Sequence, residues 1–276
     1  MMMLLHVLML SLVSSVSAEV VEDFEEKCGQ FFAGRKSPTT FTGSQYEQIC
    51  QTLNGVVHYA TYYDTKNKIP VYSAYRFEGI KKCKRLNKWY IEPNLDGGDN
   101  TDMKFEKDVN IPRLGRHQAL NRDYVRSGSD RGHLQPVFQA NSQSCADATF
   151  TLTNAAPQNP SFNRGQWRAL EEKMANKLSE QCKEYSAFIV TGVTPGKRKL
   201  NNRVNVPRYF WTAYCCLDNN EKCQISGGFF GVNKNHTPKE KTVNDLEKYL
   251  KKIYKVKSFK VFDSSTEPAM ESGLLF

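Results

Sequence analysis

The chain has 276 residues, of which 39% are hydrophobic and 12% aromatic, which is enough apolar material to bury a sizeable core. This composition argues against an intrinsically disordered protein. The formal net charge is +9, and clustered Lys and Arg side chains attract polyanions. Charge alone does not separate a nucleic acid from a heparin-like sugar or an anionic membrane surface.

The first 18 residues combine an apolar run with small residues, and Val16-Ser17-Ala18 suits signal-peptidase cleavage before Glu19. The alternative is an uncleaved anchor, which the short, serine-interrupted apolar stretch disfavours. No later stretch is long enough to span a bilayer. We therefore expect residues 1–18 to be a signal peptide and residues 19–276 to be a secreted, extracellular chain with no stable membrane association.

All the cysteines lie in this expected mature chain, and their even number is typical of disulfide-bonded proteins from an oxidising compartment. The spacing does not choose among the many pairings. No Cys-x-x-Cys pair is present, which disfavours a structural zinc site. We expect disulfides among the eight cysteines, which are Cys28, Cys50, Cys83, Cys145, Cys182, Cys215, Cys216 and Cys223.

In the first half of the chain, residues 56–78 predict a β-hairpin. Its strands, VVHYATYYDT and PVYSAYRFE, are rich in β-branched and aromatic residues and flank the turn segment Lys66-Asn67-Lys68. Residues 92–130 lack apolar periodicity and are rich in Pro, Gly, Asn and Asp. We expect this stretch to form long connecting loops that frame a cleft.

In the second half, helical spacing over residues 163–182 places Trp167, Leu170, Met174, Leu178 and Cys182 on one stripe. Strands are predicted at residues 185–193, 204–217 and 224–232. A second helix is predicted over residues 243–254, and Thr242 with Asp245 resembles a capping box at its start. The pattern predicts one mixed α+β domain over residues 30–262.

One histidine stands apart because of its neighbours. His133 ends the segment Asp130-Arg131-Gly132-His133, and on an extended segment Arg131 and His133 project from one face. Gly132 lets another backbone or a ligand come close. This arrangement suits holding a phosphate beside a base. Outside the signal segment the other histidines are His58, His117 and His236, and we expect His58 and His236 to be structural or surface groups.

Together with two downstream segments, this motif resembles the DNA/RNA non-specific endonucleases. The residues that carry the resemblance are Asp130-Arg131-Gly132-His133, Asn154-Ala155-Ala156-Pro157-Gln158, Asn163, Trp167, Leu170 and Glu171. The gaps of nine residues from Asn154 to Asn163 and eight from Asn163 to Glu171 match that family's pattern. Further segments, such as Pro70–Tyr75 and Trp89 with Glu92-Pro93, resemble the secreted endonuclease domain-containing 1 branch. The resemblance spans Gln45 to Leu250.

The resemblance implies a fold and a set of roles. The fold is α+β, with mixed or antiparallel sheets around a ββα-metal (His-Me finger) catalytic core. His133 would be the general base that activates water, and Arg131 would contact the scissile phosphate. Asn154 would orient the catalytic loop or the His133 ring.

The resemblance also implies a metal site. Asn163 would bind one Mg²⁺ directly, with Mn²⁺ as an alternative ion, and Glu171 would act through a metal-bound water or from the second shell. A helix rises about 1.5 Å per residue, so the Asn163 and Glu171 backbones would lie roughly 12 Å apart. Both could bind the same ion directly only if the first helical turn were distorted.

A second phosphate-binding arginine is implied as well. Arg85 is the best match, with Arg76 and Lys84 as alternatives, and it lies in a basic segment from Lys81 to Lys88. Another basic cluster, made of Lys197-Arg198-Lys199, Arg203 and Arg208, could extend a track for the nucleic-acid backbone. Such contacts carry no base information, in keeping with a non-specific enzyme.

The resulting hypothesis is a secreted, Mg²⁺-dependent endonuclease that hydrolyses phosphodiester bonds in DNA and RNA without sequence specificity. The main alternative is a catalytically silent extracellular protein that binds nucleic acid or heparin and retains the nuclease fold. A disulfide-rich structural protein is a third interpretation, but it leaves the spacing of His133, Asn154, Asn163 and Glu171 unexplained.

Overall fold

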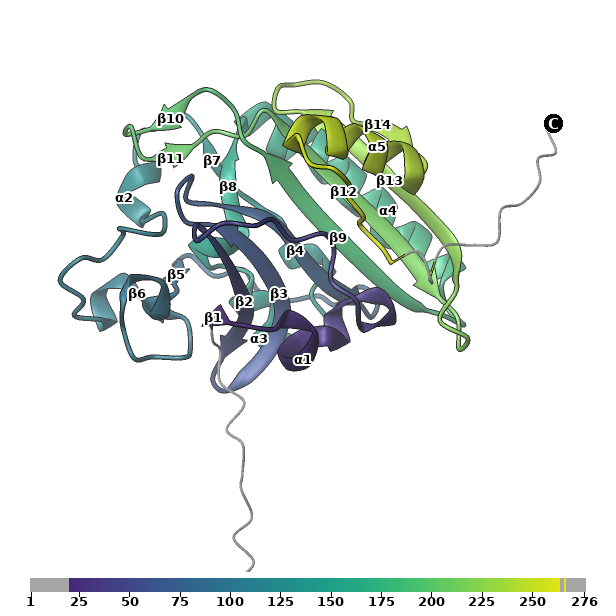
Figure 1. The fold of residues 1–276 in the computed structure, drawn as a ribbon, viewed down its shortest axis with the longest axis horizontal. Coiled ribbons are helices and arrows are strands. Elements are labelled where there is room, and N and C mark those ends of the chain that lie inside the picture. The colour runs from purple at the N-terminus through teal and green to yellow at the C-terminus, as the bar shows by residue number, and fades with distance from the viewer. Residues whose placement is uncertain (1–19, 264–265, 267–276) are drawn as a thin grey trace, which may run out of the picture.

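A computed structural model describes residues 20–263 and residue 266 (Figure 1). The predicted signal peptide, residues 1–18, lies outside the described residues. The described part is built around an eight-stranded sheet in which all neighbouring strands are antiparallel. In spatial order the strands are β1 (Val20–Val21), β2 (Tyr46–Leu53), β3 (Val56–Asp64), β4 (Ile69–Phe77), β9 (Ser186–Thr194), β12 (Tyr209–Leu217), β13 (Cys223–Val232) and β14 (Lys239–Lys241).

Most predicted strands are confirmed, including the β3–β4 hairpin. The strand predicted over residues 204–217 is instead two, β11 (Val204–Asn205), which pairs with β10 (Lys199–Leu200), and β12. Pro207 lies at the break, where it has no N–H to continue a ladder. Strand β2 was not predicted because Gln51 is buried within it and donates to Thr153 Oγ1 at 2.8 Å, which hides the apolar pattern.

The sheet carries a hydrophobic core on each face. Helix α4 (Arg168–Gln181) contributes Met174 and Leu178 to one core. Helix α5 (Val243–Tyr254) contributes Leu246 and Leu250 to the other. Figure 1 shows α5 in front of the sheet and α4 behind it. The predicted helix over 243–254 is confirmed, and Thr242 caps it by accepting from the Asp245 N–H. No helix within the described residues is long and apolar enough to cross a membrane.

Three disulfides fasten the described chain: Cys28–Cys50, Cys182–Cys216 and Cys215–Cys223. Adjacent residues in a strand point to opposite faces, so Cys215 and Cys216 bond to partners on different sides of the sheet. The expectation of disulfides is thereby confirmed for six cysteines. Cys83 and Cys145 are thiols in this structure.

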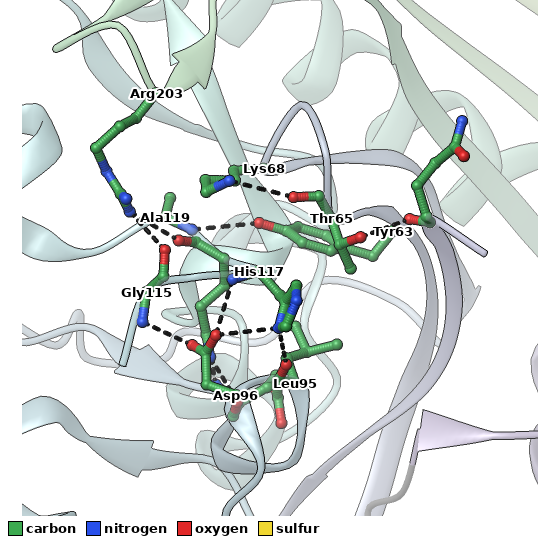
Figure 2. A network of polar contacts seen from close by, with 12 residues as sticks. Tyr63, Thr65, Lys68, Leu95, Asp96, Gly115, His117, Ala119 and Arg203 are labelled. Atoms are coloured by element: carbon green, nitrogen blue, oxygen red, sulfur yellow. Dashed lines mark hydrogen bonds and ion pairs between the residues drawn. The ribbon is translucent and has the colours of Figure 1, made fainter. Parts of the chain in front are cut away.

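The long connection over residues 92–130 holds short elements: η3 (Pro93–Asp96), β6 (Lys104–Phe105), which pairs with β5 (Tyr90–Ile91), η4 (Glu106–Asp108) and α2 (Asn121–Tyr124). Polar contacts centred on Asp96 fix its path (Figure 2). The Asp96 carboxylate accepts from the backbone N–H groups of Gly115 and His117 at 2.7 and 2.8 Å. Arg203 joins the network from the β10–β11 turn by donating to the Gly115 carbonyl. These hydrogen bonds hold the loop region in one conformation against the rest of the fold.

Candidate active site

The predicted catalytic core is a hairpin followed by a helix. Strand β7 (Asp130–His133) pairs antiparallel with β8 (Ala155–Gln158), with His133 opposite Ala155 and Asp130 opposite Gln158. The helical segment that follows runs from Phe162 through α4. Between the strands lie η5 (Val137–Gln139), α3 (Gln143–Ala148) and η6 (Leu152–Asn154). This order is a ββα unit, as the resemblance implied.

Gly132 has a different role from the one expected. A Cβ at this position would overlap the side chain of Gln158, which lies over the Gly132 backbone. The group that approaches Gly132 closely in this structure is therefore a side chain from the neighbouring strand. Arg131 and His133 still share one face of β7, as predicted, because they are two residues apart in a strand.

His133 lies in an aromatic pocket. Its ring centroid is 4.8 Å from that of Trp89 and 4.9 Å from that of Phe150. Burial and, to a smaller extent, the positive charge of Arg85 together lower the pKa of His133 to about 3. Its Nε2 atom is buried without a hydrogen-bond partner among the described residues. The ring is thus held neutral, and its buried Nε2 is left without a partner among the described residues.

Arg131 is fixed by aromatic rings and by one loop residue. Its guanidinium lies over Tyr124 at 5.1 Å and over Trp89 at 5.6 Å, and it donates to the backbone and side-chain oxygens of Asn121, both at 3.2 Å. The Nε of Arg131 is buried and has no partner in the described chain. Beside it opens a cavity of about 420 Å³ lined also by Phe105 and neighbouring loop residues. A guanidinium that lines such a cavity suits an anionic ligand.

Of the three candidates for a second phosphate-binding residue, Arg85 is the one next to His133. Its guanidinium lies 5.3 Å from the ring centroid of Phe150, and its charge lowers the pKa of both His133 and Glu171. Arg76 is instead engaged with Glu78 at 3.7 Å and with the Ser186 hydroxyl at 3.1 Å.

The helix that carries Asn163 does not begin as a regular α-helix. Residues Phe162–Trp167 form a π-helical segment, and the α-helical geometry starts only at Arg168. The uniform helix predicted from residue 163 is therefore wrong in its first turn. A π-segment is wider and shorter than an α-helix of the same residues, and such segments are frequent at functional sites. A distortion of the first turn is what direct binding of one ion by both Asn163 and Glu171 would need.

Asn163 is oriented by Asp130. Its Nδ2 donates to Asp130 Oδ2 at 2.9 Å, and Arg164 donates to both oxygens of the same carboxylate at 2.8 and 2.6 Å. Because the amide nitrogen is occupied, the amide oxygen of Asn163 is directed elsewhere and has no partner in the described chain. An oxygen of this kind is a suitable ligand for a hard cation.

Burial raises the pKa of Glu171 to about 8, although the Trp167 indole and the charge of Arg85 lower it. A nearby cation would favour the ionised form. No group of three or more His, Cys, Asp or Glu side chains that could hold a metal is found in the described residues. The Asn163 and Glu171 oxygens therefore fit an ion such as Mg²⁺, which keeps several waters, better than one that demands a full protein ligand set.

Asn154 is a structural link. It is fully buried, and its Oδ1 accepts from Gln135 N at 2.9 Å and from Ser73 Oγ at 3.0 Å. Its Nδ2 donates to the carbonyls of Gln135 and Thr149, both at 3.0 Å. Of the two roles implied by the resemblance, the geometry favours orientation of the loop after His133, because no hydrogen bond joins Asn154 to the His133 ring.

The second basic cluster is only partly available as a phosphate track. Arg203 pairs with the buried Asp123 at 3.0 Å and donates to the Gly115 carbonyl at 2.7 Å, so it is a structural residue.

His117 and His58 are also structural: His117 Nδ1 lies 2.7 Å from the Leu95 carbonyl, and His58 Nε2 lies 3.0 Å from Ser144 Oγ.

The family sequence profile described as DNA/RNA non-specific endonuclease matches residues 37–267. The chain belongs to this family. Human endonuclease domain-containing 1 protein is 33% identical over 198 residues, which cover 69% of this chain and 39% of that protein. Human mitochondrial endonuclease G is 41% identical over 96 residues, covering 34% of this chain and 31% of that protein. The chain thus matches less than half the length of these relatives.

A solved structure supports the fold. A chain in the crystal structure of the EndoG/EndoGI complex aligns with a TM-score of 0.50 at 24% identity, covering 69% of this chain and 80% of that one. The expected α+β architecture is therefore confirmed by the antiparallel sheet, the ββα unit and this neighbour.

Two residues of the site had been given no role from the sequence. Trp89 and Phe150 form the aromatic pocket around His133. Trp89 follows the basic segment that contains Arg85, and Phe150 precedes η6. No spacing rule joins positions so distant in the chain, because β7 and the loops bring them together.

Proposed function

We propose that this protein is an endonuclease that hydrolyses phosphodiester bonds in DNA and RNA without sequence specificity, with His133 as the general base. The supporting observation is the neutral imidazole that packs against Trp89 and Phe150 and whose buried Nε2 has no partner among the described residues. The names of relatives, including endonuclease G, support the same class of reaction.

His133 accepts the proton of the attacking water as the new bond to phosphorus forms. Arg131 binds the scissile phosphate through its guanidinium, which lines the cavity beside Trp89, and Arg85, whose guanidinium lies over Phe150, holds a neighbouring phosphate oxygen. Both arginines recognise phosphate, which every nucleic acid carries, so the proposed contacts impose no sequence preference.

Asn163 and Glu171 would hold Mg²⁺, or Mn²⁺ in its place, through one amide oxygen and a carboxylate that binds directly or through water. When bound, the ion supplies positive charge that stabilises the transition state and the leaving 3′-oxygen. Asp130 keeps the Asn163 oxygen directed to this position.

We further propose that the protein acts outside the cell. The apolar start of the sequence and the three disulfides support this localisation. Nucleic acid bound through exposed cations on the basic segment from Lys81 to Lys88 would be released by salt.

Plasmid cleavage tests the proposal against a silent binding protein. The wild type should nick and linearise plasmid DNA and degrade RNA with Mg²⁺, and EDTA should stop both. His133→Ala should lose roughly 10³-fold in kcat while still binding DNA. His236→Ala, which removes an exposed histidine far along the chain from β7, is the matched control and should cut normally. Salt-sensitive binding without metal-dependent cleavage by the wild type would favour the silent binding protein.

A further inference from the structure

The two thiols of the structure pack in one small apolar cluster. Cys145 is buried in α3 among Val137, Ala146 and Phe150, and Cys83 packs against this cluster from the basic segment before Trp89. The two groups are close enough for ionised Cys83 to raise the pKa of Cys145. The other six cysteines of the described chain are already paired.

The backbone around Cys83 is held in place by α3 itself. Gln143 Oε1 accepts from the Lys84 N–H at 2.8 Å, and Gln143 Nε2 donates to the Lys84 carbonyl at 3.0 Å. Both backbone groups of the residue after Cys83 are therefore fixed to the helix that carries Cys145, two positions after Gln143. These two hydrogen bonds hold the segment that carries Cys83 against the helix that carries Cys145 before any covalent bond forms.

We propose that Cys83 and Cys145 are a covalent cross-linking site, at which an additional disulfide fastens the basic segment to α3. Cys83 is the accessible partner, because Cys145 is 3% exposed whereas Cys83 is partly exposed. Burial raises the pKa of Cys145 to about 11, so the reaction begins at Cys83.

The bond forms by exchange with an external small-molecule disulfide. The Cys83 thiolate attacks one sulfur of that disulfide, which breaks the external S–S bond, forms a mixed disulfide and releases one thiol that takes up a proton. The Cys145 thiolate then attacks the Cys83 sulfur, forms the internal bond and expels the second external thiol with another proton. Two protein thiols are oxidised, and one external disulfide is reduced to two thiols.

The cross-link would determine the position of Arg85. Arg85 follows Cys83 by two residues, and its guanidinium lies over Phe150, a member of the same cluster as Cys145. Fastening Cys83 to α3 thus holds Arg85 beside His133. This functional consequence rests on the proposed nuclease activity, whereas the disulfide itself does not.

Peptide mapping tests the disulfide directly. The full chain is purified without reductant from the medium of a secretory host, treated with N-ethylmaleimide under denaturing conditions and digested. A peptide pair joined through Cys83 and Cys145, with neither cysteine alkylated, is expected. Complete alkylation of both, with the three structural disulfides intact, would overturn the proposal.

Limited trypsin digestion tests whether the Cys83–Cys145 disulfide fastens the basic segment to α3, and it does not depend on nuclease activity. The segment offers cleavage after Lys81, Lys82, Lys84, Arg85 and Lys88. Cys83→Ser leaves the packing of Cys145 in place, and it should be cut there at least about tenfold faster than the wild type. Ile80→Ser, a change at an exposed residue directly before this segment that removes no thiol, should be cut like the wild type. Mildly reduced wild-type protein should match Cys83→Ser, and equal resistance of all forms would show that no tether exists.

Kinetics then test the link to Arg85. Cys83→Ser should raise KM for DNA about fivefold and leave kcat within about twofold, because it loosens a phosphate contact and leaves the base in place. In an Arg85→Ala background the same substitution should add nothing. If the disulfide is mapped but Cys83→Ser leaves KM unchanged, the cross-link stands and the claim that it positions Arg85 is refuted. Absence of any cleavage by the wild type would refute the proposed function alone.

Discussion

The carboxylate of Asp130 accepts a 2.9 Å hydrogen bond from the side-chain amide of Asn163. The bond joins the first residue of β7 to the π-helical segment that precedes α4. It therefore couples the strand that ends in His133 to the residue that we propose as the metal ligand. Asp130, the first residue of the Asp-Arg-Gly-His segment, therefore orients the Asn163 side chain, a role that the sequence alone did not suggest.

Asp130→Asn should weaken metal binding. The substitution removes the charge that orients the Asn163 amide. Loss of a group that hydrogen-bonds to a metal ligand typically costs about 10–100-fold in metal affinity or activity. We expect the Mg²⁺ concentration for half-maximal cleavage to rise about tenfold. Arg164→Ala is the control, because it removes the exposed ion pair to the same carboxylate and should change the value less than about twofold. Equal effects of the two variants would show that Asp130 acts through Arg164.

The pH dependence should come from Glu171 and not from His133. The pKa of His133, lowered to about 3, keeps the imidazole neutral between pH 5 and pH 8. The pKa of Glu171 is raised to about 8, so the proton on this carboxyl competes with Mg²⁺ below that pH. The Mg²⁺ requirement should fall about tenfold for each unit of pH rise between pH 5 and 7, and less steeply as the pH approaches 8. Calorimetric titration of Mg²⁺ into wild type and Glu171→Gln measures this, and a pH slope retained in the variant would contradict the assignment.

The sequence predicted the regular parts of this fold and its ββα unit, whereas the roles of the site residues stay predictions. The β3–β4 hairpin and α5 follow from local periodicity, which each segment carries by itself. The apolar stripe of α4 also predicted its helix, but a stripe of buried residues does not reveal the π-segment at its start. That segment depends on contacts such as the bond from Asn163 to Asp130, which joins residues distant in the chain.

The surroundings of the site could not be predicted for the same reason. The aromatic pocket pairs Trp89 with Phe150 around His133, and only the folded loops bring them together. Arg203 illustrates the opposite error. Its position in a basic cluster suggested a phosphate contact, whereas the structure uses it to hold Asp123 and the Gly115 carbonyl.

Gly132→Ala should destabilise the protein through a clash with Gln158. The added Cβ would overlap the Gln158 side chain in the neighbouring strand, which is buried and cannot move to solvent. We expect a loss of about 2 kcal/mol in the free energy of unfolding, measured by urea denaturation. Gln158→Ala in the same chain removes the nearest atoms but keeps its own Cβ, so the double variant should recover part of the loss. No recovery would mean that the strain lies in the backbone of β7.

Glu92 should make the stability of the protein fall as the pH rises. Glu92 is 4% exposed and accepts from the hydroxyls of Thr151 and Thr153, and burial raises its pKa from 4.5 to about 8. Between these two pKa values the folded protein holds a proton that the unfolded chain has lost, so raising the pH through this window favours unfolding. Relative to Glu92→Gln, the wild type should lose roughly 3–4 kcal/mol of unfolding free energy between pH 5 and pH 8. Urea denaturation at the two pH values tests this, with Glu172→Gln as a control for the same charge change at a more exposed position on α4. Parallel pH profiles for the wild type and Glu92→Gln would show that Glu92 titrates normally in the folded protein.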